Sequence, residues 1–420
     1  MTFSRLFTLL VVTTALSATA ADWSQWRGPL RDGHATAGQK FPTRLDEEPR
    51  VVWRLPAGPG LSSPVIAGGK VVAFDAQNGE ETLRLLDAKD GRELWRAAVD
   101  KPFSDSQGPT GPRGTPLLEG DRVYAVSCRG ELQCRAVADG KLLWRTSYMT
   151  NWGATFIGEK GNTPGAARHG NNGSPVIHGD LLIANAGGTN GAGVIALDKR
   201  TGELRWKSQN DMAAYAAPVI GTIGGREQVI SFTADGGLGL DAKDGRFLWR
   251  FPVKTAFARH VGAPVVWNNL VVIGSHQAGL FGLNITRDGD RQEAQPSWTS
   301  KEAAINFSCP VRVGDQLYGL GPAKDLFCLD LADGRIRWKH TGLAMGPADK
   351  AWVSLLALGD KLLGLTDTGT LVLFAAKPDA YEELGQQQVC ANNWCHPAYA
   401  DGRLYLRDSK QWFCVELTTP

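Results

Sequence analysis

Short apolar runs separated by glycine-containing turns recur along the whole chain. The runs at residues 181–184 (LLIA) and 271–273 (VVI) are apolar at every position, which predicts strands that are buried on both faces. Turns rich in Asp and Gly follow such runs, and these residues favour tight connections between neighbouring strands. The pattern predicts an all-β protein of many short antiparallel strands.

One unit repeats within this pattern. It starts with a small residue, Pro and an apolar residue, and it ends with Gly followed four residues later by Trp. That spacing occurs at Gly91 and Trp95, Gly140 and Trp144, Gly202 and Trp206, Gly245 and Trp249, and Gly334 and Trp338. The spacing from Gly289 to Trp298 is nine, which indicates an insertion. Units start at 63, 115, 174, 217, 263, 309, 354 and 396, and this period predicts propeller blades.

The two ends of the chain complete each other. The last unit offers three strands within residues 397–417, and residues 50–54 (RVVWR) form a lone outer strand near the start. Pairing them would remove an exposed sheet edge. We therefore expect one eight-bladed β-propeller of four-stranded antiparallel blades at residues 22–420, with an N-terminal extension at 22–49. The tryptophans expected to dock between blades are Trp53, Trp95, Trp144, Trp206, Trp249, Trp298 and Trp338.

The first 21 residues have the order of a secretory signal peptide. Arg5 precedes an apolar run at 6–16, and Ala18-Thr19-Ala20 has the form of a cleavage site. No cysteine stands at the cleavage point, so there is no lipobox and a lipid anchor is not expected. No other stretch is apolar enough for a helix to span a membrane. We expect a periplasmic or secreted protein.

Charge and cysteine content narrow the function classes. The 45 Lys and Arg residues nearly balance the 43 Asp and Glu residues, which argues against nucleic acid as a partner. Seven cysteines are an odd number, so at least one thiol stays free or pairs between chains. Cys390, Cys395 and His396 resemble a haem-attachment site with an unusual four-residue spacer. However, His396 occupies the position at which a blade begins, and a disulfide between Cys390 and Cys395 is the stronger alternative.

Two segments carry a family resemblance. Residues 87–95 (DAKDGRELW) and 241–249 (DAKDGRFLW) resemble the tryptophan-docking repeats of pyrroloquinoline-quinone (PQQ) dehydrogenases and of the BamB outer-membrane assembly factor. Residues 22–29 (DWSQWRGP) resemble the start of secreted PQQ-like propeller proteins. The resemblance implies the propeller fold.

The chain departs from both families. The dehydrogenases are similar to one another in using an adjacent Cys-Cys disulfide and Ca²⁺-binding carboxylates. This chain has no Cys-Cys pair, and the nearest carboxylates are Asp105, Asp211 and Glu302. BamB resembles a lipoprotein, whereas this chain lacks the lipobox cysteine.

The residues just before the inner strands are the candidate binding site, because these loops converge on one mouth of the channel. They combine cations, amides and aromatic rings, which suits a small anionic or hydroxylated ligand. The alternative is that they satisfy loop carbonyls. The candidates are Arg113, Asn172, Tyr215, His260, Asn306 and Trp394.

We therefore expect an exported, non-catalytic and monomeric propeller that binds a small ligand or an envelope protein partner at this mouth. We assign no catalytic residue, no metal ligand and no cofactor. One alternative is a quinoprotein oxidoreductase that uses PQQ with Ca²⁺. The other is a BamB-like scaffold in outer-membrane protein assembly. The sequence does not identify the ligand or partner.

Overall fold

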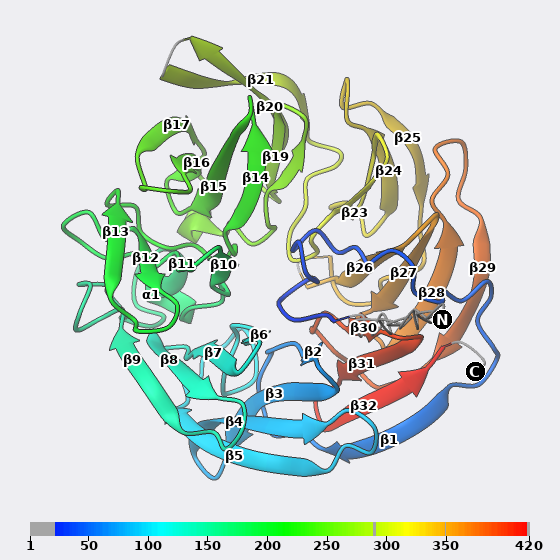
Figure 1. Cartoon of the computed structure of the whole chain (residues 1–420). Coiled ribbons are helices and arrows are strands. Elements are labelled where there is room, and N and C mark those ends of the chain that lie inside the picture. The colour runs from blue at the N-terminus through cyan, green and yellow to red at the C-terminus, as the bar shows by residue number, and fades with distance from the viewer. Residues whose placement is uncertain (1–21, 289–290, 349, 418–420) are drawn as a thin grey trace, which may run out of the picture.

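The computed structural model describes residues 22–288, 291–348 and 350–417. The expected signal peptide at 1–21 lies outside the described residues and stays a prediction. Eight four-stranded antiparallel sheets form a ring around a central channel (Figure 1). The eight-bladed propeller predicted from the sequence is confirmed.

Each blade runs outward from its inner strand. The first four blades are β2 (Val65–Ala67), β3 (Lys70–Gln77), β4 (Glu80–Asp87) and β5 (Glu93–Asp100); β6 (Leu117–Glu119), β7 (Arg122–Val126), β8 (Glu131–Ala136) and β9 (Leu142–Ser147); β10 (Val176–His178), β11 (Leu181–Ala184), β12 (Val194–Asp198) and β13 (Leu204–Ser208); and β14 (Val219–Ile223), β15 (Arg226–Thr233), β16 (Gly236–Asp241) and β17 (Phe247–Pro252). The next three blades are β18 (Val265–Trp267), β19 (Leu270–Ser275), β20 (Gly279–Asp288) and β21 (Arg291–Ser300); β22 (Val311–Val313), β23 (Gln316–Leu320), β24 (Leu326–Asp330) and β25 (Ile336–His340); and β26 (Val353–Leu358), β27 (Lys361–Thr366), β28 (Thr370–Ala375) and β29 (Glu383–Gln388). The last blade combines β30 (Ala398–Ala400), β31 (Arg403–Arg407) and β32 (Gln411–Glu416) with β1 (Arg50–Pro56).

The pairing of β1 with β32 closes the ring. Val51 lies opposite Val415, and Arg54 lies opposite Phe413, so the outer strand of the last blade comes from the start of the chain (Figure 1). This pairing is the closure that the lone strand at 50–54 predicts. It covers the edge of β32, and β1 becomes the outer strand of the last blade.

Tryptophans on the outer strands join neighbouring blades. The Trp53 indole donates to the Ala88 carbonyl at 3.0 Å, and the Trp144 indole donates to the Lys199 carbonyl at 3.1 Å. Each ring packs on a turn glycine of the next blade. A Cβ added to Gly91, whose φ is +74°, would lie 2.8 Å from the Trp53 ring, so both the space and the backbone require glycine here.

Two details differ from the predicted docking. Trp95 and Trp338 are only half-buried, although each indole donates to a carbonyl of the next blade. Trp249 is 1% exposed, but it donates to Gln228 in its own blade at 2.8 Å. The following blade replaces the usual Asp-Gly turn with the long β20–β21 hairpin, so the common carbonyl acceptor is not presented to Trp249.

Part of the N-terminal extension crosses the channel. Residues 23–34, called here the plug, bridge from Ile66 in the inner strand β2 to Ala357 in β26. Arg27 donates to the Pro310 carbonyl at 2.6 Å, and Arg31 donates to the Pro175 carbonyl at 2.7 Å. Both arginines are 2% exposed. Burial, followed by repulsion from Arg27, lowers the pKa of Arg31 to about 9.

The fold contains little helix. Besides the strands, the described residues form α1 (Gly165–His169) and the short 3₁₀ turn η1 (Ala256–Ala258). Within the described ranges, no helix combines the length and apolar character that a membrane crossing requires.

Candidate functional site

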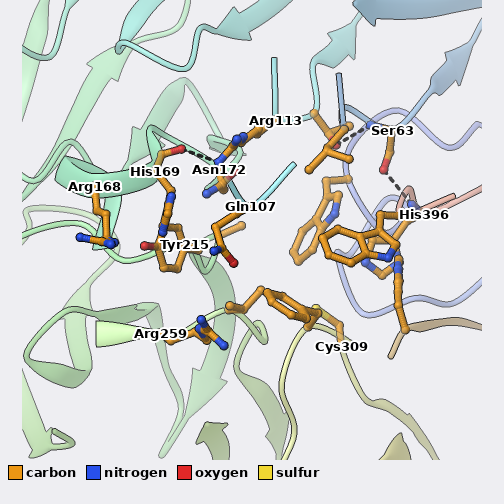
Figure 2. Close-up of a pocket in the computed structure, with 18 of the residues that line it drawn as sticks. Ser63, Gln107, Arg113, Arg168, His169, Asn172, Tyr215, Arg259, Cys309 and His396 are labelled. Carbon is orange, nitrogen blue, oxygen red and sulfur yellow. Dashed lines mark hydrogen bonds between the residues drawn. The ribbon is translucent and has the colours of Figure 1, made fainter. Parts of the chain in front are cut away.

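A pocket of about 260 Å³ lies at the mouth of the channel where the loops lead into the inner strands. We call this side of the ring the mouth face. The plug supplies Trp26 to the lining, and the long loops before the inner strands supply most of the rest (Figure 2). The lining includes three arginines, two histidines and no aspartate or glutamate. Its aromatic rings are Trp26, Tyr215, Phe257, Phe307, Trp352 and Trp394.

The structure brings together four of the six candidate residues. Arg113, Asn172, Tyr215 and Trp394 line the pocket. The side chains of His260 and Asn306 are not part of the lining, although their neighbours Arg259 and Phe307 are. The sequence locates the loops, while the rotation of the backbone within each loop decides which of two adjacent side chains faces the channel.

His260 instead packs inside a blade. Its ring stacks on Phe232 with 4.2 Å between centroids, and its Nδ1 lies 2.7 Å from the Thr233 carbonyl oxygen. Burial lowers the pKa of His260, so the imidazole is neutral at pH 7. This histidine therefore has a packing role behind the mouth.

Behind the pocket wall, one carboxylate holds two lining residues. Asp105 has a side-chain exposure of 1%, and its two oxygens lie 2.8 Å from Arg113 Nη2 and from His169 Nδ1. Arg113 also donates to the His169 carbonyl at 2.8 Å (Figure 2). Burial would raise the pKa of Asp105, but the hydrogen bonds from His169 and Arg113 outweigh it and hold that pKa well below its usual range. Asp105 thus neutralises Arg113 and fixes the orientation of His169.

The other two arginines rest on aromatic rings. The Arg168 guanidinium lies 4.6 Å from the centroid of Phe257, and the Arg259 guanidinium lies 5.7 Å from that of Phe307. Among the residues that the structure describes, neither has a carboxylate within 4.0 Å. Arg168 Nη1 also donates to the Gly161 carbonyl at 2.9 Å, but neither positive charge is neutralised by an acidic group, so both charges are available to a ligand.

The opposite wall is aromatic and neutral. His396 Nδ1 lies 2.6 Å from the Ser354 hydroxyl, and its ring is packed edge-on by Trp26 and Trp352. Burial, followed by the nearby Arg27 charge, lowers the pKa of His396 well below its usual value. Phe307 and Trp394 stack beside this wall with 5.3 Å between centroids.

The cysteines near His396 are not bridged. All seven cysteines of the chain are free thiols in the structure, so it does not contain the alternative disulfide between Cys390 and Cys395. Cys395 donates to the Leu61 carbonyl at 3.3 Å, and Asn393 approaches the Cys390 sulfur. His396 is buried and forms a hydrogen bond with Ser354. Its place in the sequence is therefore better explained by its position at the start of a blade than by haem attachment.

The donor set does not fit the calcium ion of the dehydrogenases. Asp105 is committed to Arg113 and His169, Asp211 pairs with Arg250, and Glu302 pairs with Lys339. In residues 22–288, 291–348 and 350–417, no group of three or more His, Cys, Asp or Glu residues is placed to hold a metal ion. A calcium ion at this mouth would therefore lack its carboxylate ligands.

Sequence reasoning missed several lining residues. Gln107, Phe257 and Phe307 lie in the same long loops as the candidates, and a search for every aromatic residue in those loops would have found Phe257 and Phe307. Trp352 lies in the loop before β26, which holds no candidate. Trp26 lies in the segment 22–29, for which the sequence indicated a family resemblance but no place in the binding site. Its role depends on the plug crossing the channel, which no local pattern shows.

The fold and the pocket define a repeat β-propeller with a loop-built pocket at one end of its channel. Residues 36–164 and 79–340 match the model of the family described as outer membrane protein assembly factor BamB, and the chain belongs to this family. BamB of Yersinia pestis is 28% identical over 276 residues, which are 64% of this chain and 61% of the relative. BamB of Alteromonas naphthalenivorans is 25% identical over 298 residues, which are 67% of this chain and 68% of that protein.

The match spans about three fifths of the length of the Yersinia relative. Among solved structures, the computationally designed Ika8 protein superposes with a TM-score of 0.57 at 11% identity. That superposition covers 87% of this chain and 99% of the designed one, and it shows the fold alone.

Proposed function

We propose that this chain is an exported, non-catalytic propeller that binds a small anionic, ring-containing ligand at the mouth of its channel. The observation that carries the proposal is a pocket with three arginines and no carboxylate in its lining. Arg168 and Arg259 would bind the acidic group, and the rings of Trp26, Tyr215 and Trp394 would pack against the body of the ligand. Asn172 and Gln107 offer amides for hydroxyl groups.

A pair of sugars tests this proposal directly. Glucuronate and glucose share a ring and differ in one carboxylate, so calorimetric titration should show tighter binding of glucuronate. Arg259→Gln should weaken glucuronate binding by about tenfold, as expected for a lost charge-assisted hydrogen bond. The matched control is Arg92→Gln, which removes an exposed arginine on the opposite side of the ring. Equal affinity for the two sugars would contradict the proposal.

The same titration with PQQ, with and without Ca²⁺, addresses the enzymatic alternative. Tight binding together with reduction of an artificial dye by alcohols or sugars would overturn the non-catalytic assignment. Because the lining lacks carboxylates for the metal, we expect no dependence on Ca²⁺.

The family match favours a second candidate function. The relatives are named outer membrane protein assembly factors, so this chain would bind a protein partner in the periplasm and support outer-membrane assembly. Deleting the gene would then lower the amount of folded outer-membrane proteins. An unchanged outer-membrane profile, with an intact ligand response in the sugar titration, would favour the small-ligand function.

A further inference from the structure

The mouth face carries more arginine–phenylalanine pairs than the pocket alone contains. In each pair, the guanidinium lies within 6 Å of the ring centroid. The four pairs are Arg259 and Phe307, Arg168 and Phe257, Arg113 and Phe103, and Arg129 and Phe156, and we call them the arginine track. Three of the arginines line the pocket, and Arg129 lies beyond it.

The pairs are joined into one continuous surface. Phe103 and Phe156 meet edge to face with 4.8 Å between centroids, which connects the Arg113 pair with the Arg129 pair. The loop that carries Phe156 is tied to α1 by a hydrogen bond from Ile157 N to the Ala167 carbonyl at 2.8 Å. The track therefore leads from the pocket, past α1, to a second hollow.

Helix α1 forms the wall that both hollows share. Its Arg168 and His169 line the pocket, whereas its Ala166 and Ala167 line a shallow hollow together with Arg129 and Phe156. The exposed apolar side chains Met149 (40% exposed) and Ile157 (46% exposed) lie in the same loop as Phe156. This second hollow has a volume of only about 10 Å³, so a ligand longer than the pocket would lie across its rim and not inside it.

The charge of the track is only partly compensated by acidic groups. Arg113 is neutralised by Asp105, but Arg129, Arg168 and Arg259 have no carboxylate partner within 4.0 Å in the described part of the chain. Hydrogen bonds from Ser106 lower the pKa of the nearby Glu159, so its ionised carboxylate places one negative charge beside the track, 4.0 Å from His169 Nδ1. Three separated positive charges, each beside an aromatic ring, require a partner with repeated negative charges.

We propose that the arginine track binds a chain of uronic acids, with the terminal sugar in the pocket and the following sugars across α1 toward Arg129. Each sugar unit combines a carboxylate for a guanidinium with a C–H face that packs on an aromatic ring. The pocket volume of about 260 Å³ lies just below the range of about 300–1,000 Å³ for drug-sized ligands, which suits the end of a chain. The proposal rests on the proposed function, because the terminal sugar occupies the same pocket.

Chain length provides the test. The purified full propeller is titrated with oligogalacturonates of one, two, four and six units and with their carboxyl-reduced, neutral counterparts. We expect the affinity to rise with length for the acidic series alone and to fall with added salt. Arg129→Gln should weaken binding of the six-unit oligomer by about twofold to fivefold, the range for an exposed charge pair, and leave binding of the single sugar unchanged. Arg92→Gln is the control, and thermal unfolding of each variant verifies folding.

The outcomes separate this inference from the proposed function. The arginine track would be contradicted if the single sugar binds through Arg259 but six units bind no tighter, or if Arg129→Gln has no effect. The proposed binding of a single sugar in the pocket would then remain. If no acidic sugar of any length binds, both fail. If a single-stranded oligonucleotide binds tighter than the six-unit oligomer, the track serves nucleic acid, and the assignment to uronic acids is overturned.

Discussion

The two faces of the ring differ in how regular their loops are and in how their charged side chains are held. On the face opposite the mouth, the Asp-Gly turns repeat almost unchanged: Asp198 accepts hydrogen bonds from the N–H groups of Arg200 and Thr201, and Asp241 does the same for Lys243. On the mouth face, the loops differ in length and composition, and arginines rest on aromatic rings instead of pairing with acids. The comparison indicates that the repeated turns stabilise the ring, whereas the irregular loops carry the residues that we propose as the binding site.

The largest effect is expected at a docking tryptophan. Trp249→Ala should lower the free energy of unfolding by roughly 3–5 kcal/mol, because the side chain is 1% exposed and fills the contact between two blades. Thermal and denaturant unfolding measure the loss. The matched control is Phe247→Ala in the same strand, since that ring is 46% exposed. An unchanged midpoint for Trp249→Ala would show that the docking positions do not carry the stability of the ring.

The carboxyl of Glu81 gives a pH-dependent test behind the mouth. Glu81 accepts the Cys128 N–H at 3.1 Å, while its other oxygen is buried and has no partner within the described residues. Burial raises the pKa of Glu81 from its usual 4.5 to about 8. The folded protein thus keeps this proton up to about pH 8, whereas the unfolded chain releases it near pH 4.5. Stability should therefore fall as the pH rises through this window.

Glu81→Gln removes this dependence because the amide cannot ionise. At pH 8 the variant should be more stable than the parent by up to about 4 kcal/mol, since one pKa unit corresponds to about 1.36 kcal/mol. Unfolding curves between pH 5 and pH 8 measure the difference. Glu80→Gln serves as the control, because the Glu80 carboxylate is 45% exposed beside Lys101. Parallel pH profiles for Glu81→Gln and the parent would argue against a protonated Glu81.

The same contrast explains what the sequence predicts. The eight unit starts predict the blade number, and the lone strand at 50–54 predicts the closure of the ring. Both can be found from the sequence because each is a local pattern that the chain repeats or completes. The mouth is predicted only as a set of loops. His260 and Phe307 show why: whether a side chain faces the channel depends on the path of an irregular loop. The plug was not foreseen, because its arginines bond to carbonyls distant in sequence, such as Pro310 and Pro175.

The smallest effect on stability is expected at the mouth. Arg259→Gln should change the free energy of unfolding by less than about 0.5 kcal/mol, because the guanidinium is partly exposed on Phe307 and neutralises no carboxylate among the described residues. The same variant should lose most of its affinity for glucuronate. Chemical denaturation measures the first quantity and titration the second. If Arg259→Gln lowered the free energy of unfolding by about 2 kcal/mol or more, this arginine would stabilise the fold. That result would contradict the division of the ring into a structural face and a binding face.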